Sequence, residues 1–206
     1  MDIQTAYDRW SSAYDADKNI TRDLDAWVTR TLFSDVSLSS VLEFGCGTGK
    51  NTSFFASVSQ HVQALDISGA MLALAQESVT VPNVVFEQAD ISGRWPCADE
   101  SHDLISCNLI LQHVCTLDSV FSEASRTLCR GGQFFINELH PIKKYQGSMA
   151  RYIWEGESHA IKAFDHQISH FVRAASQNGL KLIDLDEWWH EDDEGRPPRL
   201  VSMLFE

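Results

Sequence analysis

The sequence predicts an α/β fold, in which a mostly parallel, Rossmann-like sheet of seven strands ends in an antiparallel hairpin and carries helices on both faces. From residue 40 onward, short apolar runs alternate with helical stretches. The first of these runs leads directly into a glycine-rich turn, and the last two are separated by a short loop containing Gly195, Pro197 and Pro198. Alternating strands and helices imply right-handed crossovers between parallel strands, whereas a short loop joins antiparallel ones.

The elements follow from the spacing of apolar side chains. Two helices are expected within residues 3–33, because Ile3, Tyr7, Trp10 and Tyr14 recur at steps of three and four. Strands are then predicted at residues 41–44, 62–65, 84–87, 104–107 and 133–139, with helices between them. A last helix, running from Phe164 to Ala175, precedes the two hairpin strands near residues 180–188 and 200–205.

Length and composition limit the function classes. The 206 residues predict one domain, and the net charge of −13 disfavours a nucleic-acid partner. No apolar run approaches the roughly 20 residues that cross a bilayer, and the N-terminus lacks the pattern of a signal peptide. Five cysteines without a C-x-x-C pair favour the cytoplasm. His166 and His170 lack a third ligand, so no metal site is expected.

The most informative segment is the turn Gly45-Cys46-Gly47-Thr48-Gly49, which follows the first strand and the acid Glu43. Glycines let a ligand approach the backbone closely. A dinucleotide fingerprint has the order G-x-G-x-x-G, but Lys50 occupies the last position here, which argues against a nicotinamide-dependent oxidoreductase. The G-x-G-x-G form resembles motif I of the class I S-adenosylmethionine-dependent methyltransferases.

The resemblance continues in order as far as Leu139. It implies that Asp66, after the second strand, accepts the ribose hydroxyls, and that Asp90 and Ile91 meet the adenine. Asn108 and the segment after it resemble the small-molecule, methyltransferase-11-like branch, and the Pro-Pro-aromatic signature of base and glutamine methylases is missing. His102 and Arg130 depart from the family's usual phenylalanine and proline. The cofactor-binding residues implied are Tyr14, Glu43, Gly45, Cys46, Gly47, Gly49, Asp66, Ile67, Met71, Asp90, Ile91, Asn108 and Leu109.

Residues 7–15 resemble the helix that covers the cofactor in related enzymes, where the second tyrosine, here Tyr14, reaches the methionine carboxylate. Residues 1–33 are therefore expected to form a lid. The same spacing also fits an amphipathic helix that only packs aromatic side chains on the core.

Methyl transfer requires a positioned acceptor and, for a hydroxyl or protonated amine, a base. His113 and His140 are the candidate bases, and either is equally compatible with a packing or capping role. Residues 140–160 are expected to form an irregular substrate lid, in which Tyr145, Arg151 and Tyr152 contact an acceptor carrying a carboxylate or phosphate. The sequence thus predicts methyl transfer to an oxygen or nitrogen of a small metabolite. The alternative from another class is a cofactor-binding protein without catalysis.

Overall fold

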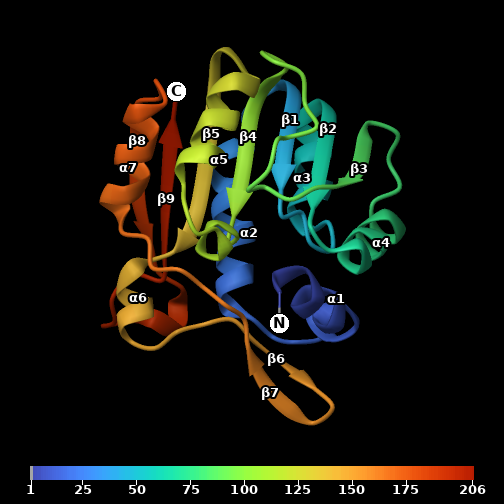
Figure 1. Ribbon diagram of the computed structural model, residues 1–206, viewed down its shortest axis with the longest axis vertical. Coiled ribbons are helices and arrows are strands. Elements are labelled where there is room, and N and C mark those ends of the chain that lie inside the picture. The colour runs from blue at the N-terminus through green and yellow to red at the C-terminus, as the bar shows by residue number, and fades with distance from the viewer. Residues whose placement is uncertain (1) are drawn as a thin grey trace.

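A computed structural model describes residues 2–206 and contains a seven-stranded sheet in the order β3-β2-β1-β4-β5-β9-β8 (Figure 1). The first five strands of this order pair in parallel, and β9 runs antiparallel to both β5 and β8. The strands are β1 Leu38–Phe44, β2 Ser59–Asp66, β3 Val84–Gln88, β4 His102–Asn108, β5 Leu128–Leu139, β8 Leu182–Trp188 and β9 Leu200–Phe205. The predicted fold class and all seven predicted strands are confirmed.

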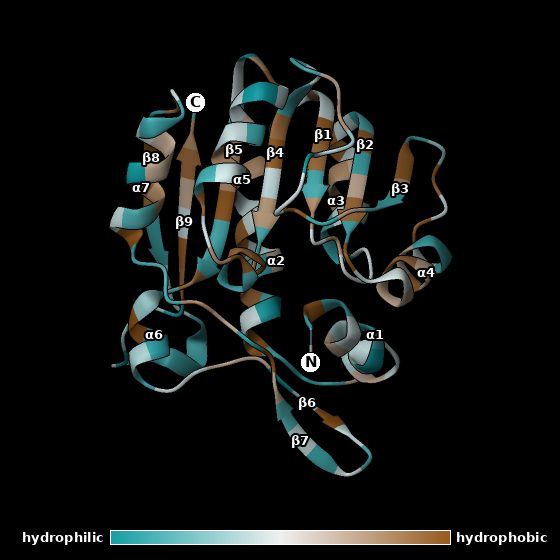
Figure 2. Cartoon of the chain, in the orientation of Figure 1, coloured by the Kyte–Doolittle hydropathy of each residue, from teal (hydrophilic) through white to brown (hydrophobic). Residues whose placement is uncertain are grey.

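Helices cover both faces of the sheet, because successive strand residues point to opposite sides. On one face, Val41 of β1 packs in a cluster with residues of α2, α3 and α4, whereas Leu42 faces α5 and α7 on the other. Figure 2 shows hydrophobic residues along the central strands of the sheet and many hydrophilic residues on the helices around it. The helices are α1 Ile3–Tyr14, α2 Ile20–Phe33, α3 Lys50–Val58, α4 Gly69–Ser78, α5 Asp118–Thr127, α6 Pro141–Tyr145 and α7 Ile168–Gln177, with 3-10 turns at Leu111–His113 and Glu191–Asp193.

The first helix lies apart from these two layers, across the carboxyl ends of the parallel strands (Figure 1). The Asp8 carboxylate attaches it to the start of α4 by accepting hydrogen bonds from the Ser68 hydroxyl at 2.5 Å and from the Ala70 N–H at 3.3 Å. At the other end of α1, Asp15 accepts a hydrogen bond from Thr48 in the glycine-rich turn. This helix therefore closes over the edge of the sheet where the glycine turn lies.

The segment 140–160 is more regular than expected. It contains the short helix α6 and a hairpin of β6 Arg151–Trp154 and β7 Glu157–Ala160, which extends below α1 in Figure 1. Tyr152 is buried and stacks on Trp10 of α1, whereas the neighbouring Ile153 is 64% exposed, as strand alternation requires. The turn Glu155-Gly156 has two positive φ angles, a conformation that favours tight hairpins. The expected irregularity was therefore wrong, because a period-2 pattern this short was overlooked, whereas the role of residues 140–160 as a substrate lid stays a prediction.

The start of the last helix was also predicted too early. Helix α7 begins at Ile168, after the N-cap Gln167, so Phe164 lies in the loop before it. The Phe164 N–H donates to the Gln112 carbonyl at 2.7 Å, which holds this loop against the segment after β4. No helix in residues 2–206 is long and apolar enough to cross a membrane.

Candidate cofactor and acceptor cavity

The glycine-rich turn joins β1 to α3 through backbone conformations that side chains disfavour. Gly45 has φ +71° and Gly47 has φ +54°. A Cβ atom added at Gly45 would stand 2.2 Å from Cγ2 of Ile110, whereas one added at Gly47 would meet no atom within 4 Å. Gly45 is therefore required by packing against the segment after β4, and Gly47 leaves its backbone open beside the cavity.

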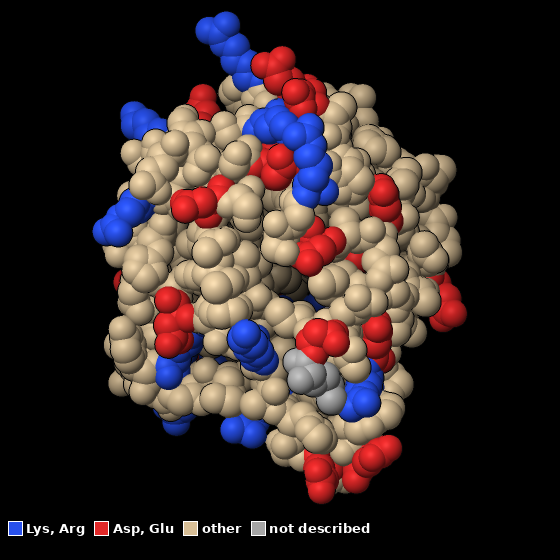
Figure 3. Space-filling view, viewed as in Figure 1, with Lys and Arg blue, Asp and Glu red and all other residues tan. Residues whose placement is uncertain are grey.

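A cavity of about 710 Å³ opens beside this turn, at the carboxyl ends of β1 to β4. Its walls come from α1, the start of α2, the glycine turn, the ends of β2 and β3, the segment after β4 and the loop before α7. Figure 3, which is viewed as Figure 1, shows a hollow in the middle of the visible surface, with acidic and basic side chains around it. A pocket at the ends of the strands, where the strand order reverses between β1 and β4, is the usual ligand site of such sheets.

The side of the cavity below β2 and β3 combines two acids with apolar side chains. The Asp66 carboxylate accepts hydrogen bonds from the Gly47 N–H at 2.9 Å and from the Ser68 N–H at 2.8 Å. Burial raises its pKa, and these backbone N–H groups oppose the rise. Asp90 accepts from the N–H and hydroxyl of Ser92. The apolar residues lining this side are Phe44, Ile67, Met71, Ala89 and Ile91.

On the opposite side of the glycine turn, α2 contributes a buried acid that the sequence analysis did not identify. Asp25 is 6% exposed and accepts hydrogen bonds from three amides: Asn51 of α3, Asn108 of β4 and Asn137 of β5. Burial raises the pKa of Asp25 to about 6, and the three amide donors limit the rise. Asn108, which was predicted to bind the cofactor from the end of the fourth strand, is thereby tied to α2.

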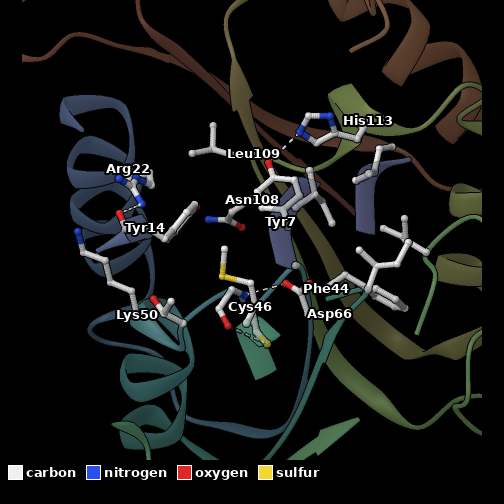
Figure 4. Close-up of a pocket in the computed structure, with 18 of the residues that line it drawn as sticks. Tyr7, Tyr14, Arg22, Phe44, Cys46, Lys50, Asp66, Asn108, Leu109 and His113 are labelled. Carbon is white, nitrogen blue, oxygen red and sulfur yellow. Dashed lines mark hydrogen bonds between the residues drawn. The ribbon is translucent and has the colours of Figure 1, made fainter. Parts of the chain in front are cut away.

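Arg22, three residues before Asp25 on α2, also lines the cavity and was missed as well. Its guanidinium donates to the Tyr14 and Asp17 carbonyls and lies 3.9 Å from the centre of the Tyr14 ring. Figure 4 shows Tyr14, Arg22 and Lys50 on one side of the cavity and His113 on the opposite side. A spacing of three residues puts Arg22 and Asp25 on one face of α2, which is the signal in the sequence that could have identified both.

His113, a candidate base, lies in the 3-10 turn after β4 and lines the cavity. Its Nδ1 is 2.7 Å from the Lys162 carbonyl, so this nitrogen carries the proton and donates it. Nε2 then accepts a hydrogen bond from the Tyr7 hydroxyl at 2.9 Å. Burial lowers the pKa of His113, and burial raises that of Tyr7 well above its ordinary value. The pair therefore consists of a neutral imidazole and a protonated phenol at neutral pH.

Glu43, the acid before the glycine turn, is 4% exposed and accepts a hydrogen bond from the Thr52 hydroxyl at 2.6 Å. Burial raises its pKa to about 8, so it is largely protonated at neutral pH. Glu138 of β5 accepts the Leu111 N–H at 2.6 Å, and burial raises its pKa to about 7. Both acids support the walls of the cavity, and Glu43 also lines it.

The structure places several of the predicted site residues in the cavity wall and leaves others outside it. Those that line the cavity are Tyr14, Glu43, Gly45, Cys46, Gly47, Asp66, Ile67, Met71, Asp90, Ile91, Asn108, Leu109 and His113. Gly49 adjoins the wall as the N-cap of α3. The residues outside the wall are His140, Tyr145, Arg151 and Tyr152.

Each residue outside the wall has another environment. His140 caps α6 by accepting the Ile142 N–H, and its Nε2 lies 2.9 Å from the Glu187 carboxylate. Tyr145 is 78% exposed, Arg151 is exposed and Tyr152 is buried against Trp10. In residues 2–206 no group of three His, Cys, Asp or Glu side chains is arranged to hold a metal.

Comparison with known proteins shows that the chain is similar to methyltransferases. Residues 42–136 match the family described as "Methyltransferase domain". An uncharacterized methyltransferase of Emericella nidulans is 23% identical over 88% of this chain and 76% of its own length. A malonyl-[acyl-carrier protein] O-methyltransferase of Erwinia billingiae is 30% identical over 72% of this chain, which spans 57% of that relative. A solved complex of DhpI with SAH has the same fold, with a TM-score of 0.75, 21% identity and coverage of 98% of this chain and 94% of that one.

Residues 42–136 thus match a methyltransferase domain, and the whole chain has the fold of solved S-adenosylmethionine-dependent methyltransferases, so the group to test against the cavity is S-adenosylmethionine. The residues present fit this group. The acids Asp66 and Asp90 lie on the apolar side of the cavity, as an adenosine requires, and the open backbone at Gly47 separates that side from polar groups of α2. Beside them, the Oδ1 atom of Asn51 in α3 is buried and has no hydrogen-bond partner in residues 2–206.

Proposed function

We propose that this protein transfers the methyl group of S-adenosylmethionine to an oxygen or nitrogen of a small molecule. The observation that carries the proposal is that one cavity contains Asp66 and Asp90 as well as a neutral histidine, His113, that is hydrogen-bonded to a tyrosine. Bound cofactor would supply an electrophilic methyl group on a sulfonium. The protein's task is then to hold the acceptor in line with that methyl group and to take up its proton.

The proposed cofactor contacts follow the order of the strands. Asp66 accepts the ribose hydroxyls, and Asp90 and Ile91 face the adenine. The amino-acid end of the cofactor then lies toward α2, where Tyr14 and Arg22 bind its carboxylate, because guanidinium groups recognise carboxylates well. In this arrangement the adenine lies on the apolar side of the cavity, and the methionine lies on the charged side.

The acceptor is proposed to occupy the other end of the cavity, lined by Ile110, His113, Val114, Lys162 and Phe164. These residues would bind a partly apolar molecule, and the exposed Lys162 ammonium would attract an anionic group on it. The relative from Erwinia billingiae is named an O-methyltransferase, which favours an oxygen as the methylated atom. The net charge of −13 disfavours a nucleic acid in this site.

His113 is the proposed base, and Tyr7 is proposed to pass the proton to it. Because Nε2 of His113 already accepts the Tyr7 hydroxyl, an acceptor O–H can give its proton to the Tyr7 oxygen while the Tyr7 proton moves to Nε2. The Lys162 carbonyl accepts a hydrogen bond from the Nδ1–H group throughout, which stabilises the imidazolium that forms. The positive charge lost from the sulfonium is thus replaced within the same cavity.

Two experiments test this function. Titration calorimetry should give saturable binding of S-adenosylhomocysteine and no binding of NAD, and the reverse would refute the cofactor. Incubation of the protein with S-adenosylmethionine and a metabolite extract should then give a product heavier by one methylene unit in mass spectrometry. Cofactor binding without any methylated product would instead favour the non-catalytic alternative.

Substitutions distinguish the proposed roles. Asp66→Ala should weaken S-adenosylhomocysteine binding by at least about tenfold, because ribose hydroxyls lose a charged acceptor. Asp184→Ala, on the exposed edge strand β8, is the matched control and should bind normally. With the acceptor found in the extract, His113→Asn should slow turnover and His140→Ala should not. A loss of turnover confined to His140→Ala would make His140 the base.

A further inference from the structure

The Asp25 carboxylate is surrounded by amide donors rather than by a paired cation in the described part of the chain. Oδ1 of Asp25 lies 2.7 Å from Nδ2 of both Asn108 and Asn137, and Oδ2 lies 3.0 Å from Nδ2 of Asn51. No Lys, Arg or His of residues 2–206 forms an ion pair with it. The nearest cation on α3, Lys50, is instead paired with Asp23 at 2.7 Å. An ionised carboxylate that is 6% exposed is costly without a positive partner.

The same carboxylate determines which way the amides point. An ionised acid can only accept hydrogen bonds, so each asparagine must turn its NH₂ group toward Asp25 and its oxygen away. For Asn108 the oxygen accepts the Ser106 hydroxyl at 2.7 Å. The oxygens of Asn51 and Asn137 are buried and have no partner within residues 2–206. Buried acceptors without a donor are rare in folded proteins, so each calls for an explanation.

Asn51 and Asp25 both line the cavity, and Asn51 is 9% exposed. They adjoin the glycine turn on the side opposite Asp66, since α3 begins directly after Gly49 and α2 packs on α3. A buried acid and an unpaired acceptor at the same wall suit a ligand that brings both a positive charge and several N–H donors. A primary ammonium group has these properties and carries no acceptor of its own.

We propose that Asp25 and the Oδ1 atom of Asn51 bind the α-ammonium group of the cofactor's methionine. This inference rests on the proposed function, because it takes the cofactor to lie across the glycine turn. Arg22 supports it from the same face of α2: its guanidinium donates to two backbone carbonyls rather than to Asp25, so the opposite charges remain separate. One helix face then presents an anion for the ammonium and a cation for the carboxylate of a single amino acid.

Three small molecules separate the parts of the cofactor. S-adenosylhomocysteine has both the ammonium and the carboxylate, its deamino analogue retains the carboxylate alone, and 5′-methylthioadenosine has neither. Titration calorimetry on the full chain should show that the wild-type protein binds S-adenosylhomocysteine about 10- to 100-fold more tightly than the deamino analogue, as expected for a charge-assisted contact. Equal affinity for these two molecules would overturn the inference without any variant.

Variants then assign the preference to this cluster. Asp25→Asn and Asn51→Ala should remove most of the preference for S-adenosylhomocysteine over its deamino analogue and leave the affinity for 5′-methylthioadenosine nearly unchanged. Asn83→Ala is the matched control, because the Asn83 amide donates to the Ala56 and Ser59 carbonyls outside the cavity, and it should retain the preference. An Asn51→Ala protein that binds all three molecules with the wild-type preference would refute the inference. Wild-type protein that binds none of them would refute the proposed function itself.

Discussion

The packing at Gly45 gives the sharpest prediction about stability. In Gly45→Ala, the new Cβ would stand 2.2 Å from Cγ2 of Ile110, where carbon atoms normally keep about 3.5–4.0 Å, at a backbone angle of φ +71°. The left-handed conformation costs roughly 1–2 kcal/mol for a non-glycine residue, and relieving the overlap costs about 1–3 kcal/mol more. The free energy of unfolding should therefore fall by about 2–5 kcal/mol.

The controls separate strain from overlap. Gly131→Ala has a similar φ of +79° but meets no atom within 4 Å, so it should lose only the roughly 1–2 kcal/mol of strain. Adding Ile110→Ala to Gly45→Ala removes the clashing methyl group and should recover part of the loss, whereas Ile110→Val keeps both branches on Cβ and should recover little. Urea denaturation measures all of these differences.

The reasoning has a clear point of failure. If Gly45→Ala loses no more stability than Gly131→Ala, the approach of the segment after β4 is not what requires glycine at this position. Equal recovery by Ile110→Ala and Ile110→Val would also refute the overlap, because only the first of them removes Cγ2.

Two further predictions concern buried acids. Burial raises the pKa of Glu43 from 4.5 to about 8, so folding favours its protonated form. The free energy of unfolding of the wild-type protein should therefore fall as the pH rises from about 4.5 to about 8. Glu43→Gln keeps an acceptor for the Thr52 hydroxyl and should lack that decline in urea titrations. Parallel pH profiles for the two proteins would contradict this. The Arg199 guanidinium, which pairs with Asp193 at 2.7 Å, helps to lower the pKa of this acid from its usual 3.8 to about 2 despite its burial. The ionised Asp193 therefore stabilises the folded state fully above about pH 3.8, and this stabilisation is lost as the pH falls toward about 2. Asp193→Asn should lose about 3–5 kcal/mol at neutral pH and show no such acid decline, because Arg199 and Lys143 remain without their acid.

The strands and the glycine turn could be predicted because their signals are local. A buried parallel strand is a short apolar run, and Asp66 is recognisable because it ends one. Gly45 and Gly47 are set by backbone angles that few other residues adopt. The sequence alone therefore determined the fold class and the family resemblance, and it identified the glycine turn and Asp66, which line the cavity.

Contacts between distant segments could only be seen in the tertiary structure. Asp25 meets Asn137, 112 positions away, and His113 is oriented by the Lys162 carbonyl, 49 positions away. The two candidate histidines looked alike in the sequence, yet His113 faces the cavity and His140 caps α6. Local sequence determines which residues enter a strand or a turn, but the side chains that share a cavity depend on how α1, α2 and the loop before α7 pack across the end of the sheet.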